Sequence, residues 1–219
     1  FVYPQKALAN DQLSKLREMH RQVCGMPRNE FIIARYDGGT PTSNRPTIRK
    51  QGQLVLTNPD MLHYALLQYH EKWKDFFSKL RYVIIDESHV YHGIFGTSVA
   101  YIMRRLRSIC QYYGSSPQFI SSSATIDQPA DHLHLLTGLP FLEIGPDRDG
   151  SVQGRKKVWL LRSKTHYYQL GRMLTRLFVD RGLNCLTFCP SRISAERLVA
   201  DFSSSELADG RIRVYRAGL

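Results

Sequence analysis

Long apolar segments and a secretory start are absent from this sequence. No apolar run within its 219 residues approaches the roughly 20 residues that a membrane-spanning helix needs. The opening FVYPQKALAND has no basic start followed by an apolar stretch, as a secretory signal would. We therefore expect an intracellular protein with no membrane partner.

Cysteine is also scarce, and none of it has metal-binding spacing. The four cysteines are Cys24, Cys110, Cys185 and Cys189, with no Cys-x-x-Cys pair among them. A disulfide framework or a zinc site usually shows such spacings, so the pattern predicts buried thiols in a reducing compartment.

Acidic residues are few compared with basic ones. Lys and Arg total 30 against 19 Asp and Glu, a net charge of +11. Such a balance favours a polyanionic partner, nucleic acid before membrane, although a soluble protein that is merely basic stays open. Residues 1–150 carry 17 basic and 14 acidic side chains, whereas residues 151–219 carry 13 and 5. This change near Gly150 is a first indication of two units.

Apolar runs of strand length alternate with longer stretches of helical spacing. Leucine, isoleucine and valine recur on one helical face in residues 7–24, 95–113 and 166–180. The β-rich runs are residues 1–3, 31–36, 54–57, 82–86, 118–123, 158–161, 184–189 and 212–216. This alternation predicts an α/β fold whose parallel sheet is covered by helices on both faces.

The glycine-rich stretch GPDRDGSVQG, from Gly145 to Gly154, is the best candidate for a linker. We expect one α/β domain over residues 1–145, a linker over 146–154 and part of a second domain over 155–219. The second unit shows three strand-like runs, where an open α/β domain usually has five or more. We therefore expect the chain to be a piece of a longer protein.

Two adjacent carboxylates follow the apolar run Tyr82–Ile85. Ligands of open parallel sheets bind beyond the carboxyl ends of the strands, so Asp86 would face that crevice and suit Mg²⁺, held through a metal-bound water. Glu87 could deprotonate a water that attacks a γ-phosphate, and His89 could carry a proton or a hydrogen bond. An Asp-Glu pair that merely opens a loop as an N-cap fits this pattern equally well.

A second polar strand end, SSSAT, begins at Ser121. Its hydroxyl residues Ser123 and Thr125 can hydrogen-bond to Asp86 or His89 across the crevice. A polar strand end is common by itself. The combination of apolar strand, Asp-Glu-x-His, helix, strand and Ser-Ala-Thr is far more specific.

This combination resembles the superfamily 2 helicases of the DEAH/DExH type, in which Asp-Glu-x-His is motif II and Ser-Ala-Thr is motif III. Three further stretches resemble motifs of that family in the expected order: YPQKALA from Tyr3 (motif Ia), TNPDML from Thr57 (motif Ib) and LTFCPSR from Leu186 (motif IV). The resemblance implies a RecA-like first domain, truncated at its N-terminus, and the beginning of a second RecA-like domain.

The flanking segments YDGGTP, DESHVYHGIFG and RRLRSIC are similar to one branch, that of bacterial mitomycin repair factor A and its fungal homologues. Members of that branch are ATP-dependent 3′-to-5′ DNA helicases or translocases linked to DNA repair, and they usually end in a cysteine-rich zinc-binding region. The resemblance thus implies ATP and Mg²⁺ as cofactors, and zinc only beyond this chain. It implies DNA as the partner, with a single-stranded tracking strand, and RNA stays open. The expected location is the cytoplasm or nucleoid in a bacterium and the nucleus in a eukaryote.

The resemblance also assigns roles to individual residues. The catalytic residues would be Asp86, which also binds the metal, Glu87 and His89, and the coupling residues would be Ser123, Ala124 and Thr125. The nucleic-acid contacts would be Pro4, Lys6, Thr57, Asn58, Pro59 and Arg192. Such contacts grip phosphates near helix starts without reading bases. For Arg192, a solvated position at a helix start is the competing interpretation.

Three parts of a complete helicase are missing from these 219 residues. They contain no Gly-Lys-Ser or Gly-Lys-Thr loop to hold phosphates, no motif VI with its arginine finger and no cysteine-rich region. We therefore expect ATP-driven movement along nucleic acid of a longer protein and no catalysis by this chain alone. The alternative is a non-catalytic nucleic-acid-binding fragment or a degenerate helicase, and the intact Asp86-Glu87 pair argues against degeneration.

Overall fold

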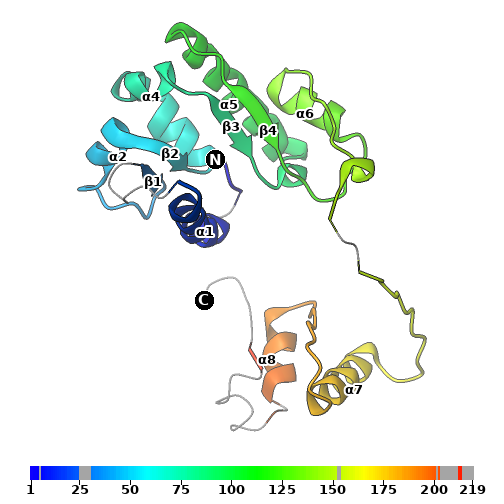
Figure 1. Cartoon of the computed structure of the whole chain (residues 1–219). Coiled ribbons are helices and arrows are strands. Elements are labelled where there is room, and N and C mark those ends of the chain that lie inside the picture. Colours follow the sequence, from blue (N-terminus) through cyan, green and yellow to red (C-terminus); the bar gives the residue numbers. More distant parts are fainter. Residues whose placement is uncertain (5, 25–30, 152–153, 201, 203–211, 214–219) are drawn as a thin grey trace. The chain divides into compact units, whose positions relative to one another are not determined.

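The computed structural model describes residues 1–4, 6–24, 31–151, 154–200, 202 and 212–213, with the side chains of residues 6–8 and 24 excepted (Figure 1). The chain divides into two compact units, Phe1–Gly150 and Ser151–Leu219. This division falls within the stretch expected to be a linker. No helix of the described part is long and apolar enough to cross a membrane.

The first unit alternates short strands with helices. Its strands are β1 (Ile32–Arg35), β2 (Gly52–Leu56), β3 (Tyr82–Ile85) and β4 (Gln118–Ser121). Its longer helices are α1 (Lys6–Cys24), α2 (Arg45–Gln51), α5 (Gly93–Tyr112) and α6 (Pro129–Thr137). Its shorter helical segments are α3 (Pro59–Met61), the π-helix η1 (Leu62–Leu67), α4 (Lys74–Ser78) and the 3₁₀ turns η2 (His70–Trp73), η3 (Ser88–Val90) and η4 (Pro146–Arg148).

All strand pairs in this unit are parallel, as the alternating pattern predicted. β1 pairs with β2, and β3 pairs with β4. Val2 joins the two pairs because it forms parallel bridges to Thr57, just after β2, and to Ile85 of β3. Its N–H donates to the Ile84 carbonyl at 2.7 Å. The first residues therefore lie between β2 and β3, and all carboxyl ends of the strands point to one edge.

Apolar side chains form a core on each face of this sheet. On one face, Ala9 of α1 forms a buried cluster with Tyr3, Ile33 and Leu56. Ala34, the residue after Ile33, joins the core on the opposite face because successive strand residues point to opposite sides. Helices thus cover both faces, which confirms the predicted layering.

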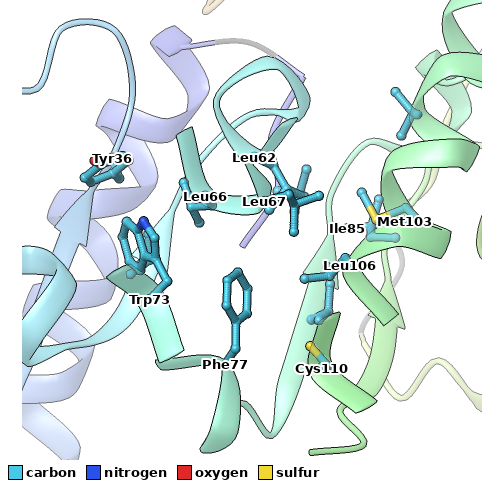
Figure 2. Close-up of a cluster of buried hydrophobic side chains, with 14 of the residues drawn as sticks. Tyr36, Leu62, Leu66, Leu67, Trp73, Phe77, Ile85, Met103, Leu106 and Cys110 are labelled. Carbon is cyan, nitrogen blue, oxygen red and sulfur yellow. The ribbon is translucent and has the colours of Figure 1, made fainter. Parts of the chain in front are cut away.

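The larger of the two cores brings the α5 side chains against the segment between β2 and β3. Figure 2 shows Trp73 and Phe77 from η2 and α4 on one side and Leu106 and Cys110 of α5 on the other. All four are at most 2% exposed. The helical period of α5 places Leu106 and Cys110 one turn apart on its inner face. The predicted burial of Cys110 is confirmed.

The described part of the second unit contains two helices, α7 (Tyr167–Asp180) and α8 (Arg192–Ala200). Thr175 of α7 is buried, and its hydroxyl lies 2.9 Å from that of Thr187. Leu198 of α8 and Phe202 are also buried. The guanidinium of Arg176 lies 5.3 Å from the centre of the Phe202 ring.

Two of the three strands expected in the second unit are a wrong prediction. Neither 158–161 nor 184–189 is a strand, and Leu160 and Phe188 are 96% and 88% exposed. Apolar composition signals β-propensity, but a strand also needs a neighbour, and no described residue of this unit pairs with either segment. Cys185 is likewise exposed rather than buried. In the run 212–216, Ile212 and Arg213 are in no strand, and the rest lies outside the described residues.

Candidate functional site

Asp86 lies directly beyond the carboxyl end of β3, as expected. Its backbone N–H donates to the Val2 carbonyl at 3.0 Å, so the N-terminal residues that lie between β2 and β3 hold Asp86 in place. Its Oδ1 accepts hydrogen bonds from the Glu87 N–H at 3.0 Å and from the Ser122 hydroxyl. Oδ2 receives no hydrogen bond from the described residues, which leaves one carboxylate oxygen for a ligand at the sheet edge.

Glu87 occupies a backbone conformation that is rare outside glycine. Its φ and ψ are 51° and 43°, in the left-handed region. A non-glycine residue in this conformation costs about 1–3 kcal/mol of folding free energy, and it persists where the surrounding structure holds it. The chain then turns at once into η3, which brings His89 back toward Glu87. The distance from His89 Nδ1 to Glu87 Oε2 is 3.3 Å.

His89 also contacts the segment after β4. The backbone N–H of Ala124 donates to His89 Nδ1 at 3.1 Å. Because Nδ1 accepts this bond, the neutral imidazole carries its proton on Nε2. A single ring nitrogen thus lies beside both the Glu87 carboxylate and the Ser-Ala-Thr segment. The structure therefore brings together Asp86, Glu87, His89 and Ala124.

The hydroxyl contacts of this segment differ from those expected. The Ser122 hydroxyl donates to Asp86, whereas the Ser123 hydroxyl donates to the Ala124 carbonyl at 2.9 Å and, among the described residues, hydrogen-bonds to neither Asp86 nor His89. Among the described residues, Thr125 also bonds to neither. The expectation that Ser123 and Thr125 reach Asp86 or His89 is therefore wrong. The cause is the register, because Ile85 pairs with Ser121 and the residues that follow them, Asp86 and Ser122, become neighbours.

Two buried tyrosines lie close enough to Asp86 to feel its charge. Burial and the negative charge of Asp86 raise the pKa of Tyr3 to about 12, and they raise the pKa of Tyr91 further. Both phenols therefore stay protonated at neutral pH. The Tyr91 hydroxyl and the Ser88 hydroxyl are buried without a hydrogen-bond partner among the described residues. Sequence reasoning did not single out Ser122 or Tyr91 as site residues.

Of the expected motif Ia and Ib contacts, two have structural partners within the chain. Thr57 is 6% exposed, and its hydroxyl donates to the Tyr36 carbonyl at 2.9 Å. Asn58 caps α3, with Oδ1 accepting from the Met61 N–H at 2.8 Å. These bonds fix the start of α3 at the carboxyl edge of the sheet. Pro59 is buried and Pro4 is half-buried, and the side chain of Lys6 lies outside the described ones.

In the second unit, Arg192 is the first residue of α8 and is exposed. The preceding residue, Ser191, performs the capping, since its hydroxyl accepts from the Ser194 N–H at 3.1 Å. Arg192 therefore has its guanidinium in solvent at a helix start. This placement is compatible with a phosphate contact and with a purely solvated position.

Asp86 is the group that could hold Mg²⁺. Among the described residues no group of three or more His, Cys, Asp or Glu side chains could hold a metal ion. Mg²⁺ keeps several waters and is often bound by one or two carboxylates plus substrate phosphates. A half-buried carboxylate with one oxygen unbonded fits that mode. It does not form a closed metal cage.

Ser122 and Ser123 make a matched pair for testing these contacts. Since the motif resemblance implies ATP hydrolysis by a longer protein, we expect Ser122→Ala in that protein to lower the hydrolysis rate by about 10-fold, because Asp86 loses a hydrogen bond that orients it. Ser123→Ala should leave hydrolysis near the wild-type rate, since its hydroxyl bonds only to its neighbour. Steady-state ATPase assays of both variants decide this. A larger loss for Ser123→Ala would contradict the observed register.

Comparison with curated proteins gives consistent matches. Residues 1–133 match the family model described as DEAD/DEAH box helicase. The chain is 37% identical over 233 residues to the "Uncharacterized ATP-dependent helicase YprA" of Bacillus subtilis, and this match covers 100% of the chain and 30% of that protein. It is 32% identical over 238 residues to the "ATP-dependent helicase hrq1" of Schizosaccharomyces pombe, covering 100% of the chain and 22% of that protein.

Solved structures agree with these matches. The DUF1998 helicase MrfA superposes with a TM-score of 0.83 at 36% identity, over 97% of this chain and 32% of that one. MrfA bound to DNA and AMPPNP gives 0.82 at 37% identity, over 90% and 28%. The Mycobacterium smegmatis helicase Lhr, at 22% identity, covers 96% of this chain and 28% of that one, and its TM-score of 0.63 shows agreement in fold.

A parallel sheet with an Asp-Glu pair beyond β3 and a hydroxyl-rich segment beyond β4 is the architecture of a RecA-like helicase domain. The chain belongs to the DEAD/DEAH box helicase family, and its relatives place it in the MrfA/Hrq1 branch of superfamily 2. It spans at most about a third of the length of these relatives.

Proposed function

We propose that this chain is the part of an ATP-dependent DNA helicase or translocase that carries the hydrolytic carboxylates. The observation that carries the proposal is the Asp86–Glu87 pair beyond β3. Ser122 of the segment after β4 hydrogen-bonds to Asp86, and Ala124 of that segment hydrogen-bonds to the neighbouring His89. The names of the relatives support ATP use. A solved relative bound to DNA and AMPPNP supports DNA as the partner.

The two carboxylates would have different roles in phosphoryl transfer. Bound Mg²⁺ supplies charge neutralisation for the phosphates. Asp86 would hold the ion through water, with Oδ1 fixed by Ser122 and the Glu87 N–H. Glu87 would orient the attacking water and accept its proton, with its carboxylate placed beside the His89 ring by the left-handed backbone.

His89, Ser123, Ala124 and Thr125 would couple hydrolysis to movement. The Ala124 N–H to His89 Nδ1 bond is the direct link between the carboxylate loop and the segment after β4. A shift of either loop lengthens or shortens this bond, so a change at the nucleotide would reach the rest of the domain. Ser123 and Thr125 are exposed beside it and would contribute through the segment rather than through Asp86.

The nucleic-acid contacts would come from Pro4, Lys6, Thr57, Asn58 and Pro59, and from Arg192 in the second unit. Thr57 and Asn58 would act mainly by holding the backbone amides of the α3 start toward a phosphate, because their side chains bond within the chain. We propose a single-stranded DNA track, 3′-to-5′ movement, a role in DNA repair and a zinc region outside this chain. These four statements rest on the branch resemblance.

The same proposal includes the domain limits and the location. The first RecA-like domain would cover residues 1–145 and the second would begin at residue 155, after a linker over 146–154. The protein would act inside the cell, in the cytoplasm or nucleoid of a bacterium or in the nucleus of a eukaryote.

Unwinding assays with the full-length protein test the proposal. Tailed duplex DNA with a 3′ single-stranded overhang should be unwound in the presence of ATP and Mg²⁺, and the same duplex with a 5′ overhang should not, because the motor would track along one strand in one direction. Chelating Mg²⁺ should stop the reaction. Preference for the 5′ overhang would overturn the polarity, and loss of unwinding with ATPase retained would point to a translocase.

A further inference from the structure

We infer that His132 of α6 is a positioning residue for the Asp86–His89 segment, called the hydrolytic loop below. This inference rests on the proposed function. The His132 Nε2 atom lies 2.9 Å from the carbonyl oxygen of Ser88. A carbonyl oxygen only accepts hydrogen bonds, so Nε2 carries a proton and donates it. Ser88 lies between Glu87 and His89, and a residue far along the chain therefore fixes the carbonyl of the residue that connects the two.

The Ser88 peptide is held from three directions. Its N–H donates to the Ser122 carbonyl at 3.0 Å, and its carbonyl also accepts from the Tyr91 N–H at 3.1 Å. The residue is fully buried, with 0% exposure. Glu87, directly before it, has the left-handed backbone, which persists only where the surroundings over-determine it. His132 is the side chain that supplies part of this constraint.

The helix that carries His132 is itself anchored to α5. Arg107 of α5 donates to the Thr137 and Gly138 carbonyls at 2.9 and 3.2 Å, and Arg104 donates to the Leu135 carbonyl at 3.0 Å. These bonds satisfy carbonyls at the C-terminal end of α6, where the helix has no internal partners. α5 begins shortly after Ser88, at Gly93. The hydrolytic loop therefore leads directly into α5, α5 holds α6, and α6 contacts the loop through His132.

His134 provides a contrast on the same helix. It is exposed, and its Nδ1 lies 3.2 Å from the Leu139 carbonyl rather than near the loop. The His-x-His pair thus has one member facing the hydrolytic loop and one facing solvent. Replacing His134 removes a histidine from the same helix, as replacing His132 does, but leaves the contact between His132 and Ser88 intact.

In the full-length protein, His132→Ala should lower kcat for ATP hydrolysis roughly 10-fold, the scale of loss seen when a group that orients a site residue is removed. KM for ATP should change little, because the loop acts on the attacking water and not on nucleotide binding. His132→Gln should recover most of the rate, since its side-chain amide can place an N–H near the former Nε2 position. His134→Ala should behave like the wild type.

Thermal denaturation of each variant and Glu87→Gln as a reference complete the experiment. Wild-type kcat in His132→Ala, with hydrolysis lost in Glu87→Gln, would overturn this inference and leave the proposed function intact. Equal losses in His132→Ala and His132→Gln, with lowered melting temperatures, would show a purely structural role and also overturn it. Undiminished hydrolysis in Glu87→Gln would remove the proposed function, and the inference with it.

Discussion

Glu87→Gln in the full-length protein should abolish ATP hydrolysis while nucleotide binding persists. The amide has nearly the same shape as the carboxylate, but it cannot accept a proton from the attacking water. Losing a general base costs about 10²-fold or more in rate. The substitution keeps a side chain that tolerates the Glu87 backbone, so the loop geometry should survive. Single-turnover hydrolysis and binding of a non-hydrolysable nucleotide measure the two effects separately.

Glu71→Gln is the matched control for this experiment. Glu71 is an exposed acid in η2, and the same change of charge there leaves the Asp86–His89 loop untouched. Its hydrolysis rate should equal that of the wild type. Retention of hydrolysis within a few-fold by Glu87→Gln would show that another group takes the proton. Loss of nucleotide binding together with hydrolysis would indicate that Glu87 holds the nucleotide instead.

The 219-residue chain by itself should show no ATP turnover, in contrast to the full-length protein. Its residues include the Asp86–Glu87 pair but no Gly-Lys-Ser or Gly-Lys-Thr loop to hold the phosphates. Phosphoryl transfer depends almost entirely on positioning and charge stabilisation, so half of a site is expected to be silent rather than slow. Phosphate release by the purified chain, with Mg²⁺ and DNA present, measures this directly.

The same chain should still bind DNA weakly, because the motif Ia and Ib segments and the basic second unit remain. Residues 151–219 carry 13 basic against 5 acidic side chains. Such binding should ignore base sequence and weaken steeply with salt, since phosphate contacts release counterions. Circular dichroism establishes that the chain is folded before either measurement. Clear ATP turnover would overturn the first expectation, and sequence-specific binding that is indifferent to salt would overturn the second.

Local patterns in the sequence determined three of the long helices, two in the first unit and one in the second, and the strand before the carboxylates. The helical spacing of residues 7–24, 95–113 and 166–180 corresponds to α1 (Lys6–Cys24), α5 (Gly93–Tyr112) and α7 (Tyr167–Asp180). The apolar run before Asp86 is β3, and the carboxylates follow its end. These features depend on neighbours within a few residues along the chain, and side-chain periodicity reports them directly.

The contacts that make the site were decided by the tertiary structure. The β3–β4 register places Ser122, and not Ser123 or Thr125, beside Asp86. The docking of α6 on α5 brings His132 to Ser88. In the second unit, two apolar runs form no strand despite their composition. Register and docking come from backbone pairing and packing between distant segments, and a shift of one residue in a strand reverses which side chains meet, so no local pattern reveals them.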